Sequence, residues 1–240
     1  MSTSINKLSI VLITFNSQKY LNQVLTSCKF ADEIVIVDSH STDKTIEIAK
    51  KHNAKIYTID WMGFGKQKQK ALDLAKNNWI FVLDSDEVIT KKLQEEILQT
   101  LKNPSHHAYY VPRLNYFFGK PVKRCGLYPD YTIRLLNKNY AKFTSDEVHE
   151  KIVVDDKKVS YLRNHMIHYA YENVEQFIAK QNRYSTLNAK NSVLKAIFNP
   201  PWTFFKLYIL KLGFLEGWRG FVISKLYSQY TFWKYIKKSL

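Results

Sequence analysis

Cysteine is scarce in this chain: its 240 residues include only Cys28 and Cys125. Neither thiol lies at the spacing from other metal-binding residues that a zinc site requires, and two isolated cysteines make no disulfide framework. Disulfides persist mainly in oxidising compartments. The cysteine content therefore argues against a secreted domain stabilised by disulfides, and it is consistent with a reduced, cytosolic compartment.

Long apolar runs are also missing. The longest stretch without a charged residue, 8–18, has eleven residues, whereas a membrane-spanning helix needs about 20. The first seven residues are polar, and the apolar stretch that follows them is too short for the pattern of a signal peptide. We therefore expect neither a transmembrane helix nor a signal peptide.

Acidic residues are few: the chain has 21 Asp and Glu but 36 Lys and Arg, which gives a net charge of +15. Such an excess indicates an anionic partner, which can be a nucleic acid, a nucleotide or an acidic membrane surface. The apolar content of 45% and the charged content of 24% are typical of a globular protein. The length allows one large domain, or one domain with an appendage.

Glycine-rich phosphate loops are absent as well. The first apolar segment, 8–14, is followed by neither Gly-x-Gly-x-x-Gly nor Gly-x-x-x-x-Gly-Lys. The common dinucleotide and P-loop sites therefore lack their phosphate cradle. If this chain binds a nucleotide, another group must neutralise the phosphates.

What is present in the first 90 residues is a regular alternation of short apolar segments with helical patterns. The predicted strands are 8–14, 33–37, 54–59 and 79–83. The last of these is apolar throughout, as is typical of a strand buried on both faces. Strands that alternate with helices in this way predict a doubly wound, mostly parallel sheet.

Polar side chains follow three of these strands directly. They are Thr14 and Asn16, then Asp38 and Asp43, then Asp84 and Asp86. Open α/β sheets bind ligands outside the carboxyl ends of their strands. Two Asp separated by one residue can share a hard divalent cation and, through it, a diphosphate. We therefore predict a nucleotide crevice at this edge, with a cation at Asp84 and Asp86 in place of a glycine loop.

Beyond residue 89 the alternation ends. We expect a helix over 91–102, and then strands over 108–113, 131–136 and 148–154 that form a mixed or antiparallel extension of the sheet. A helix is predicted over 173–195, followed by a break at 199–201. The predicted domains are a catalytic domain, 1–172, and a helical extension, 173–240.

The last forty residues carry seven Lys and Arg against one Glu, together with 12 of the 35 aromatic residues. Basic, aromatic-rich helices of this kind are typical of elements that lie on a membrane surface. The same composition also suits a helical pair that packs its aromatic side chains on the sheet domain. No nucleic-acid recognition motif is present, so we expect no nucleic-acid partner.

Three motifs carry a resemblance to a known family: Leu-Ser-Ile-Val-Leu-Ile-Thr-Phe-Asn, Val-Asp-Ser-His-Ser-Thr-Asp and Leu-Asp-Ser-Asp-Glu. In order and spacing, the chain resembles the family 2 glycosyltransferases over about residues 7–170. The resemblance implies a GT-A fold, a Rossmann-like α/β sheet flanked by helices. Asp-Glu-Val-His-Glu at 146–150 and the aromatic tail look more narrowly like the lipopolysaccharide core subgroup, which adds glucose from UDP-glucose to inner-core heptose.

The resemblance also implies roles for particular residues. The donor nucleotide would contact Thr14, Asn16, Asp38, Lys66 and Asp84. Asp86, with His168 as a further ligand, would hold Mn²⁺ or Mg²⁺ against the diphosphate. Glu150 would be the catalytic base, with Asp146 as the alternative. Glu87 receives no role.

The expected function is a metal-dependent, inverting transfer of a hexose from UDP-glucose to a lipid-linked glycan, at the inner face of the cytoplasmic membrane. Another glycan, such as a capsule, is an alternative acceptor. A nucleotidyltransferase is less favoured, because it usually has a glycine-rich basic loop after its first strand. A non-catalytic basic binding module would leave the acidic residues of the sheet edge without a role.

Overall fold

The fold was obtained as a computed structural model that describes residues 6–144 and 151–238. In its first part, strands and helices alternate as predicted. The elements in order are β1 (Leu8–Thr14), α1 (Gln18–Ser27), β2 (Glu33–Asp38), α2 (Thr45–Lys51), β3 (Lys55–Thr58), α3 (Phe64–Leu74) and β4 (Trp79–Leu83). The four predicted strands are thereby confirmed.

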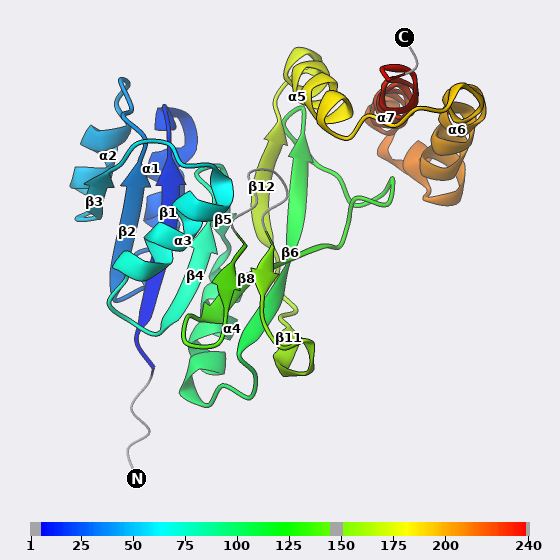
Figure 1. The fold of residues 1–240 in the computed structure, drawn as a ribbon. Helices are drawn as coiled ribbons and strands as arrows, with labels where there is room; N and C mark the ends of the chain where they lie inside the picture. Colours follow the sequence, from blue (N-terminus) through cyan, green and yellow to red (C-terminus); the bar gives the residue numbers. More distant parts are fainter. Residues whose placement is uncertain (1–5, 145–150, 239–240) are drawn as a thin grey trace. The chain divides into compact units, whose positions relative to one another are not determined.

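These four strands form a parallel sheet in the order β3-β2-β1-β4. From β1 the chain advances through β2 to β3, and it then returns to β4 on the other side of β1. Because such crossovers are right-handed, α1 and α2 cover one face of the sheet and α3 covers the other. In Figure 1, α3 lies in front of the strands. The predicted doubly wound sheet is confirmed.

The core of this sheet lies between its two helical layers. All five residues of β4 are buried, and so are nearly all those of β1. Val11, Val35 and Val82 pack with Ala71 and Leu72 of α3. A parallel strand covered on both faces needs apolar side chains on both, which explains the continuous apolar run of 79–83.

The rest of the sheet is mixed, as predicted. The elements that follow β4 along the chain are β5 (Glu87–Ile89), α4 (Lys91–Lys102), β6 (Ala108–Phe117), β7 (Lys120–Pro121), β8 (Asp130–Asn137), β9 (Lys142–Phe143), β10 (Ile152–Val153), η1 (Asp156–Lys158), β11 (Val159–Tyr161) and β12 (Met166–Tyr171). Of these strands, β9 and β10 pair with each other in a separate two-stranded sheet. Beyond β4 the strand order is β8-β6-β12-β5, with β8 antiparallel to β4 and β12 antiparallel to β5. The predicted strand at 148–154 corresponds to β10, but it pairs with β9 and does not extend the main sheet as expected. Its first residues lie outside the described part of the chain.

The C-terminal part is helical, but its divisions differ from the prediction. It consists of α5 (Val174–Leu187), α6 (Val193–Phe205), η2 (Lys206–Leu210), η3 (Gly213–Glu216) and α7 (Trp218–Ile236). The single helix expected over 173–195 is wrong, because α5 ends at Leu187 and α6 begins afresh. Ser192 caps α6 by accepting a hydrogen bond from the backbone N–H of Lys195.

The break expected at 199–201 is also wrong, because Pro200 and Pro201 lie inside α6. A proline in a helix removes one backbone hydrogen bond and crowds the preceding turn. Here α6 packs along α7, and the Ser228 hydroxyl of α7 donates to the Pro200 carbonyl at 2.8 Å. Packing against a second helix offsets the unfavourable prolines.

By its internal contacts the chain divides into two compact units, 1–113 with 131–168 and 114–130 with 169–240. The predicted domain boundary at 172 lies close to the second transition. The segment 114–130, which we placed in the catalytic domain, groups with the C-terminal helices. The second unit has a core of its own, formed by Phe117, Val122, Cys125, Tyr171, Phe177 and Ile223.

A close backbone approach closes the turn between η3 and α7. A Cβ atom on Gly220 would lie 1.8 Å from the carbonyl oxygen of Gly213, and a Cβ on Gly213 would lie 2.8 Å from the Cys125 sulfur. Neither distance leaves room for a methyl group. Only glycine therefore fits at these two positions.

We predict that Gly220→Ala lowers the free energy of unfolding by about 3 kcal/mol, because the methyl group must push the two backbones apart. Urea unfolding followed by circular dichroism measures the change. Lys225→Ala, at an exposed position of the same helix, is the control and should change it by less than about 0.5 kcal/mol. Equal stability of the two variants would contradict the close approach.

Candidate active site

The order of the parallel strands reverses between β1 and β4, which are neighbours in the sheet. At such a switch point, open parallel sheets bind ligands outside the carboxyl ends of the strands. Leu12 of β1 lies opposite Leu83 of β4. Thr14 and Asp84 therefore lie at the same edge of two adjacent strands, as the predicted crevice requires.

The ends of β1 and β2 are joined through Asp38, whose side chain is fully buried. The Thr14 hydroxyl donates to its Oδ1 at 2.7 Å, and the Ser41 hydroxyl donates to the same oxygen at 2.6 Å. The Ser41 backbone N–H donates to Oδ2 at 2.8 Å. Asp38 thus connects the end of β1 to the loop that follows β2 through buried hydrogen bonds.

Asn16 lies in the loop after β1 and is exposed. Its φ of +47° is left-handed, a conformation that asparagine tolerates better than most residues. Its side-chain oxygen accepts a hydrogen bond from the Thr42 N–H at 2.8 Å. Asp43 accepts from the backbone N–H groups of Gln18 and Thr45, so it closes the same loop at the start of α2.

The acidic turn after β4 contains a carboxylate that two cations neutralise. Arg134 Nη2 lies 2.6 Å from Oδ2 of Asp84, and Lys68 Nζ lies 3.1 Å from Oδ1. Burial raises the pKa of Asp84, but the charges and hydrogen bonds of Arg134 and Lys68 outweigh it and hold this pKa well below its ordinary range. Asp84 is therefore ionised, and each of its oxygens has a cationic partner.

Glu87 is the anchor of this turn, although no role was predicted for it. Its side chain is fully buried, and Oε1 lies 2.6 Å from Arg134 Nη2 and 3.5 Å from Arg113 Nη1. Its Oε2 accepts the backbone N–H of Asp84 at 3.1 Å. A sequence signal was present for each residue alone, because a charged side chain within an apolar strand needs a partner of opposite charge if it is buried, but it does not say which one.

Asp86 lies beside His168, and the Oδ2 and Nε2 atoms are 3.6 Å apart. Antiparallel pairing of β5 with β12 sets His168 opposite Glu87 and so next to the acidic turn. The Asp86 side chain is 38% exposed and that of His168 is 13% exposed. Carboxylate and imidazole are both ligands of divalent transition metals, so the pair has the right chemistry for a metal. Within the described residues, no third His, Cys, Asp or Glu completes a metal-binding group.

Of the three remaining predicted residues, the structure describes one. Lys66 is exposed on α3, the helix that also presents Lys68 to Asp84. Asp146 and Glu150, the two predicted bases, lie outside the described residues. The roles predicted for Thr14, Asn16, Asp38, Lys66, Asp84, Asp86 and His168 in binding remain predictions.

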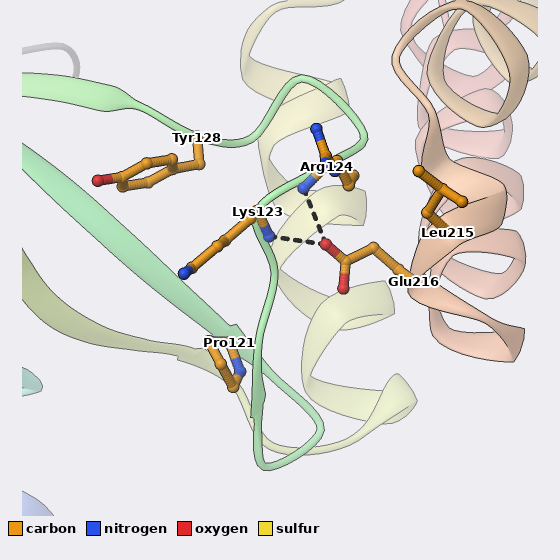
Figure 2. A pocket seen from close by; sticks show the side chains of 6 residues that line it. All are labelled: Pro121, Lys123, Arg124, Tyr128, Leu215 and Glu216. Carbon is orange, nitrogen blue, oxygen red and sulfur yellow. Dashed lines mark hydrogen bonds between the residues drawn. The ribbon is translucent and has the colours of Figure 1, made fainter.

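The second unit contains a cavity of about 510 Å³, shown in Figure 2. Its lining residues are Pro121, Lys123, Arg124, Tyr128, Leu215 and Glu216. Oε1 of Glu216 accepts hydrogen bonds from the backbone N–H groups of Lys123 and Arg124, at 2.8 and 2.9 Å. The carboxylate therefore fixes this loop, while the side chains of Lys123 and Arg124 give the cavity a basic wall.

Both cysteines are buried and neither forms a disulfide. Burial raises the pKa of the Cys28 thiol to about 12, so this thiol is unreactive at neutral pH. In residues 6–144 and 151–238, no helix has the length and apolar character needed to cross a membrane.

Comparison with known proteins decides the family. Residues 9–147, more than half of the chain, match the family described as Glycosyl transferase family 2. This chain belongs to that family. An uncharacterized glycosyltransferase of Rickettsia bellii is 30% identical to this transferase over 92% of the chain and 82% of its own length. The lipopolysaccharide core biosynthesis glycosyltransferase LpsC of Rhizobium meliloti is 29% identical, over 94% of this chain and 89% of its own length.

Solved structures confirm the fold of this transferase. The crystal structure of S. aureus TarS in complex with UDP-GlcNAc superposes with a TM-score of 0.50 at 18% identity, covering 91% of this chain and 79% of that one. A TarS structure in complex with UDP covers 88% of this chain with the same score. The predicted GT-A fold with a C-terminal helical extension is therefore confirmed, and the family match makes this chain a glycosyltransferase.

We predict that Arg134→Met lowers the free energy of unfolding by about 3–5 kcal/mol, because Glu87 then remains buried without its nearest cation. Urea unfolding measures the loss. Arg124→Met removes an exposed arginine and should cost less than about 0.5 kcal/mol. Adding Glu87→Gln to Arg134→Met should recover part of the loss, and no difference between the two arginine variants would refute the anchoring role.

Proposed function

We propose that this transferase moves glucose from UDP-glucose to a lipid-linked glycan acceptor, such as the inner core of lipopolysaccharide. The observation that carries the proposal is the Asp86–His168 pair at the switch point, beside an Asp84 that is already neutralised. The similarity to LpsC, whose name assigns it to lipopolysaccharide core biosynthesis, supports the acceptor. S. aureus TarS, solved both with UDP and with UDP-GlcNAc, supports a uridine nucleotide as the carrier.

The donor nucleotide would occupy the crevice between the ends of β1 and β4. Thr14, Asn16 and Asp38 would form the wall on the side of β1 and β2, and the hydrogen bonds that join their loops keep this wall rigid. Lys66, exposed at the start of α3, would approach the phosphates. Such a preformed site lowers the cost of ordering a ligand.

Asp84 and Asp86 would have different tasks at this site. Because Lys68 and Arg134 occupy both oxygens of Asp84, this carboxylate would orient the turn and border the ribose. Asp86, with His168, would hold Mn²⁺ or Mg²⁺, and the imidazole favours Mn²⁺ of these two. When bound, the metal neutralises negative charge on the diphosphate as UDP departs.

The transfer itself would be an inverting displacement at the anomeric carbon of the donor sugar. The acceptor hydroxyl attacks, its proton passes to a carboxylate, and the bond to the UDP oxygen breaks. We propose Glu150 as this base, with Asp146 as the alternative. Both belong to the segment 146–150, which lies between β9 and β10 in the sequence.

A different acceptor is the second candidate. S. aureus TarS is named as a poly(ribitol-phosphate) β-N-acetylglucosaminyltransferase, and it shares this fold. This transferase could therefore use another sugar or another glycan, such as a capsule. We further propose that it acts on the inner face of the cytoplasmic membrane, where a lipid-linked acceptor would meet an enzyme with excess positive charge.

We predict that Mn²⁺ raises the melting temperature of the wild type in the presence of UDP-glucose, and that Asp86→Ala abolishes both this shift and sugar transfer. A thermal-shift panel of nucleotide sugars, with and without Mn²⁺, makes the measurement and also identifies the donor. Asp73→Asn removes an exposed carboxylate from α3 and is the matched control. Wild-type turnover by Asp86→Ala without metal would sink the proposal.

We also predict that Glu150→Gln lowers kcat by at least about 100-fold, the usual contribution of a general base, while UDP-glucose binding stays unchanged. Single-turnover transfer and calorimetric UDP-glucose binding separate the two effects. Asp146→Asn, only four positions earlier in the sequence, is the comparison variant. An active Glu150→Gln with an inactive Asp146→Asn would move the role to Asp146.

A further inference from the structure

An apolar face covers the hairpin formed by α6 and α7 in the second unit. Its most prominent side chains are Leu194, Phe198, Trp202 and Phe205 of α6, with Leu215 and Trp218 at the turn of the hairpin. Leu194 is 70% exposed, Phe198 68% and Trp218 60%. Contiguous exposed apolar side chains on a protein surface mark a site of interaction with a partner or a membrane.

The spacing along α6 sets these side chains on one side of the helix. Residues 194, 198, 202 and 205 recur every three or four positions, which is one face of an α-helix. The other side packs on α7: Ala196 is buried, and the hydroxyl groups of Thr203 and Thr231 lie 3.3 Å apart. The outward side of α6 is therefore the more apolar one, the reverse of an ordinary surface helix.

Aromatic rings of the hairpin also contact one another, in two groups. Trp202 packs on Phe205 with ring centroids 5.8 Å apart, and Phe204 packs edge-on against Phe221 of α7 at 5.5 Å. Tyr208 stacks on Phe204 and links the second group to Phe214, at 6.4 Å. Other aromatic residues face inward, since Tyr227 packs against Phe177 at 5.1 Å. Some aromatic residues of the α6–α7 hairpin therefore lie in the core of the second unit, and others lie on its outer face.

The charges around the apolar face are almost all positive. Between 193 and 225 there are five basic residues and one acidic residue, Glu216. Lys195, Lys206 and Lys211 are exposed, whereas Oε1 of Glu216 accepts two backbone N–H groups. Two copies of this face would bring like charges together, while an acidic bilayer supplies the opposite charge. Charge complementarity therefore favours a membrane over a second copy of the chain.

We propose that the apolar face of the α6–α7 hairpin inserts into the headgroup region of a bilayer that contains acidic lipids. Trp202 and Trp218 would lie at the level of the headgroups, a location that suits amphipathic indole rings. Lys195, Lys206 and Lys211 would contact lipid phosphates. The inference deepens the membrane partner of the proposed function, and it concerns the second unit alone.

Vesicle co-sedimentation of the full chain tests the insertion, with phosphatidylcholine alone or mixed with phosphatidylglycerol and without nucleotide sugar or acceptor. The wild type should bind the mixed vesicles more tightly. Leu194→Ser, Phe198→Ser and Trp202→Ser combined should weaken this binding by more than about tenfold, because the inserted area is lost. Tyr140→Ser with Tyr161→Ser, which removes two exposed aromatic residues of the first unit, is the control and should bind as the wild type.

A second set of variants tests the charges. Lys195→Gln, Lys206→Gln and Lys211→Gln combined should weaken binding to the mixed vesicles by about a hundredfold at low salt, and by much less at high salt. Lys91→Gln, Lys92→Gln and Lys102→Gln remove the same charge from exposed positions on α4 and are the control. Circular dichroism of each variant verifies its folding.

Two results would overturn the proposal. The first is unchanged vesicle binding by the triple serine variant. The second is a wild type that does not bind vesicles but is a dimer by light scattering, while the triple serine variant is a monomer. The apolar face would then be the interface with a second copy of the chain. If the wild type neither binds UDP-glucose nor transfers glucose, the proposed function is refuted. The membrane proposal is unaffected by that result, because vesicle binding is measured without nucleotide sugar or acceptor.

Discussion

The buried guanidinium of Arg134 between Asp84 and Glu87 is the interaction on which the rest of the active site depends. It joins β8 to the turn that follows β4 and to β5, with both N···O distances at 2.6 Å. A buried ion is tolerated only when its partners offset the loss of water, and here two carboxylates face the one arginine while Lys68 and Arg113 balance the charge. The turn therefore has one defined geometry.

That geometry separates two aspartates that look equivalent in the sequence. Asp84 has a cation on each oxygen, whereas Asp86 is more exposed and faces His168 across 3.6 Å. A carboxylate that is already neutralised is a poorer ligand for a second cation than one that is not. Of the two carboxylates, Asp86 is therefore the better suited to hold a metal in the proposed site.

The second unit combines packing and exposure in one hairpin. Gly213 and Gly220 bring two backbone segments into contact, and Phe177 and Tyr227 close the core on the inner side. The outer side keeps Leu194, Phe198 and other large apolar residues exposed. Folding of this unit therefore leaves a large part of the apolar surface of α6 exposed.

The sequence by itself determined the doubly wound sheet and the place of the candidate site. Apolar runs and helical periods are local patterns, and the residues after each strand meet at one edge. Tertiary structure decided which side chains pair with each other. Glu87 and Arg134 are 47 positions apart, and no local pattern pairs them. The prolines of α6 follow the same logic, since local propensity predicts a break but packing on α7 keeps the helix. Long-range contacts override local preference wherever burial is worth more than the local cost.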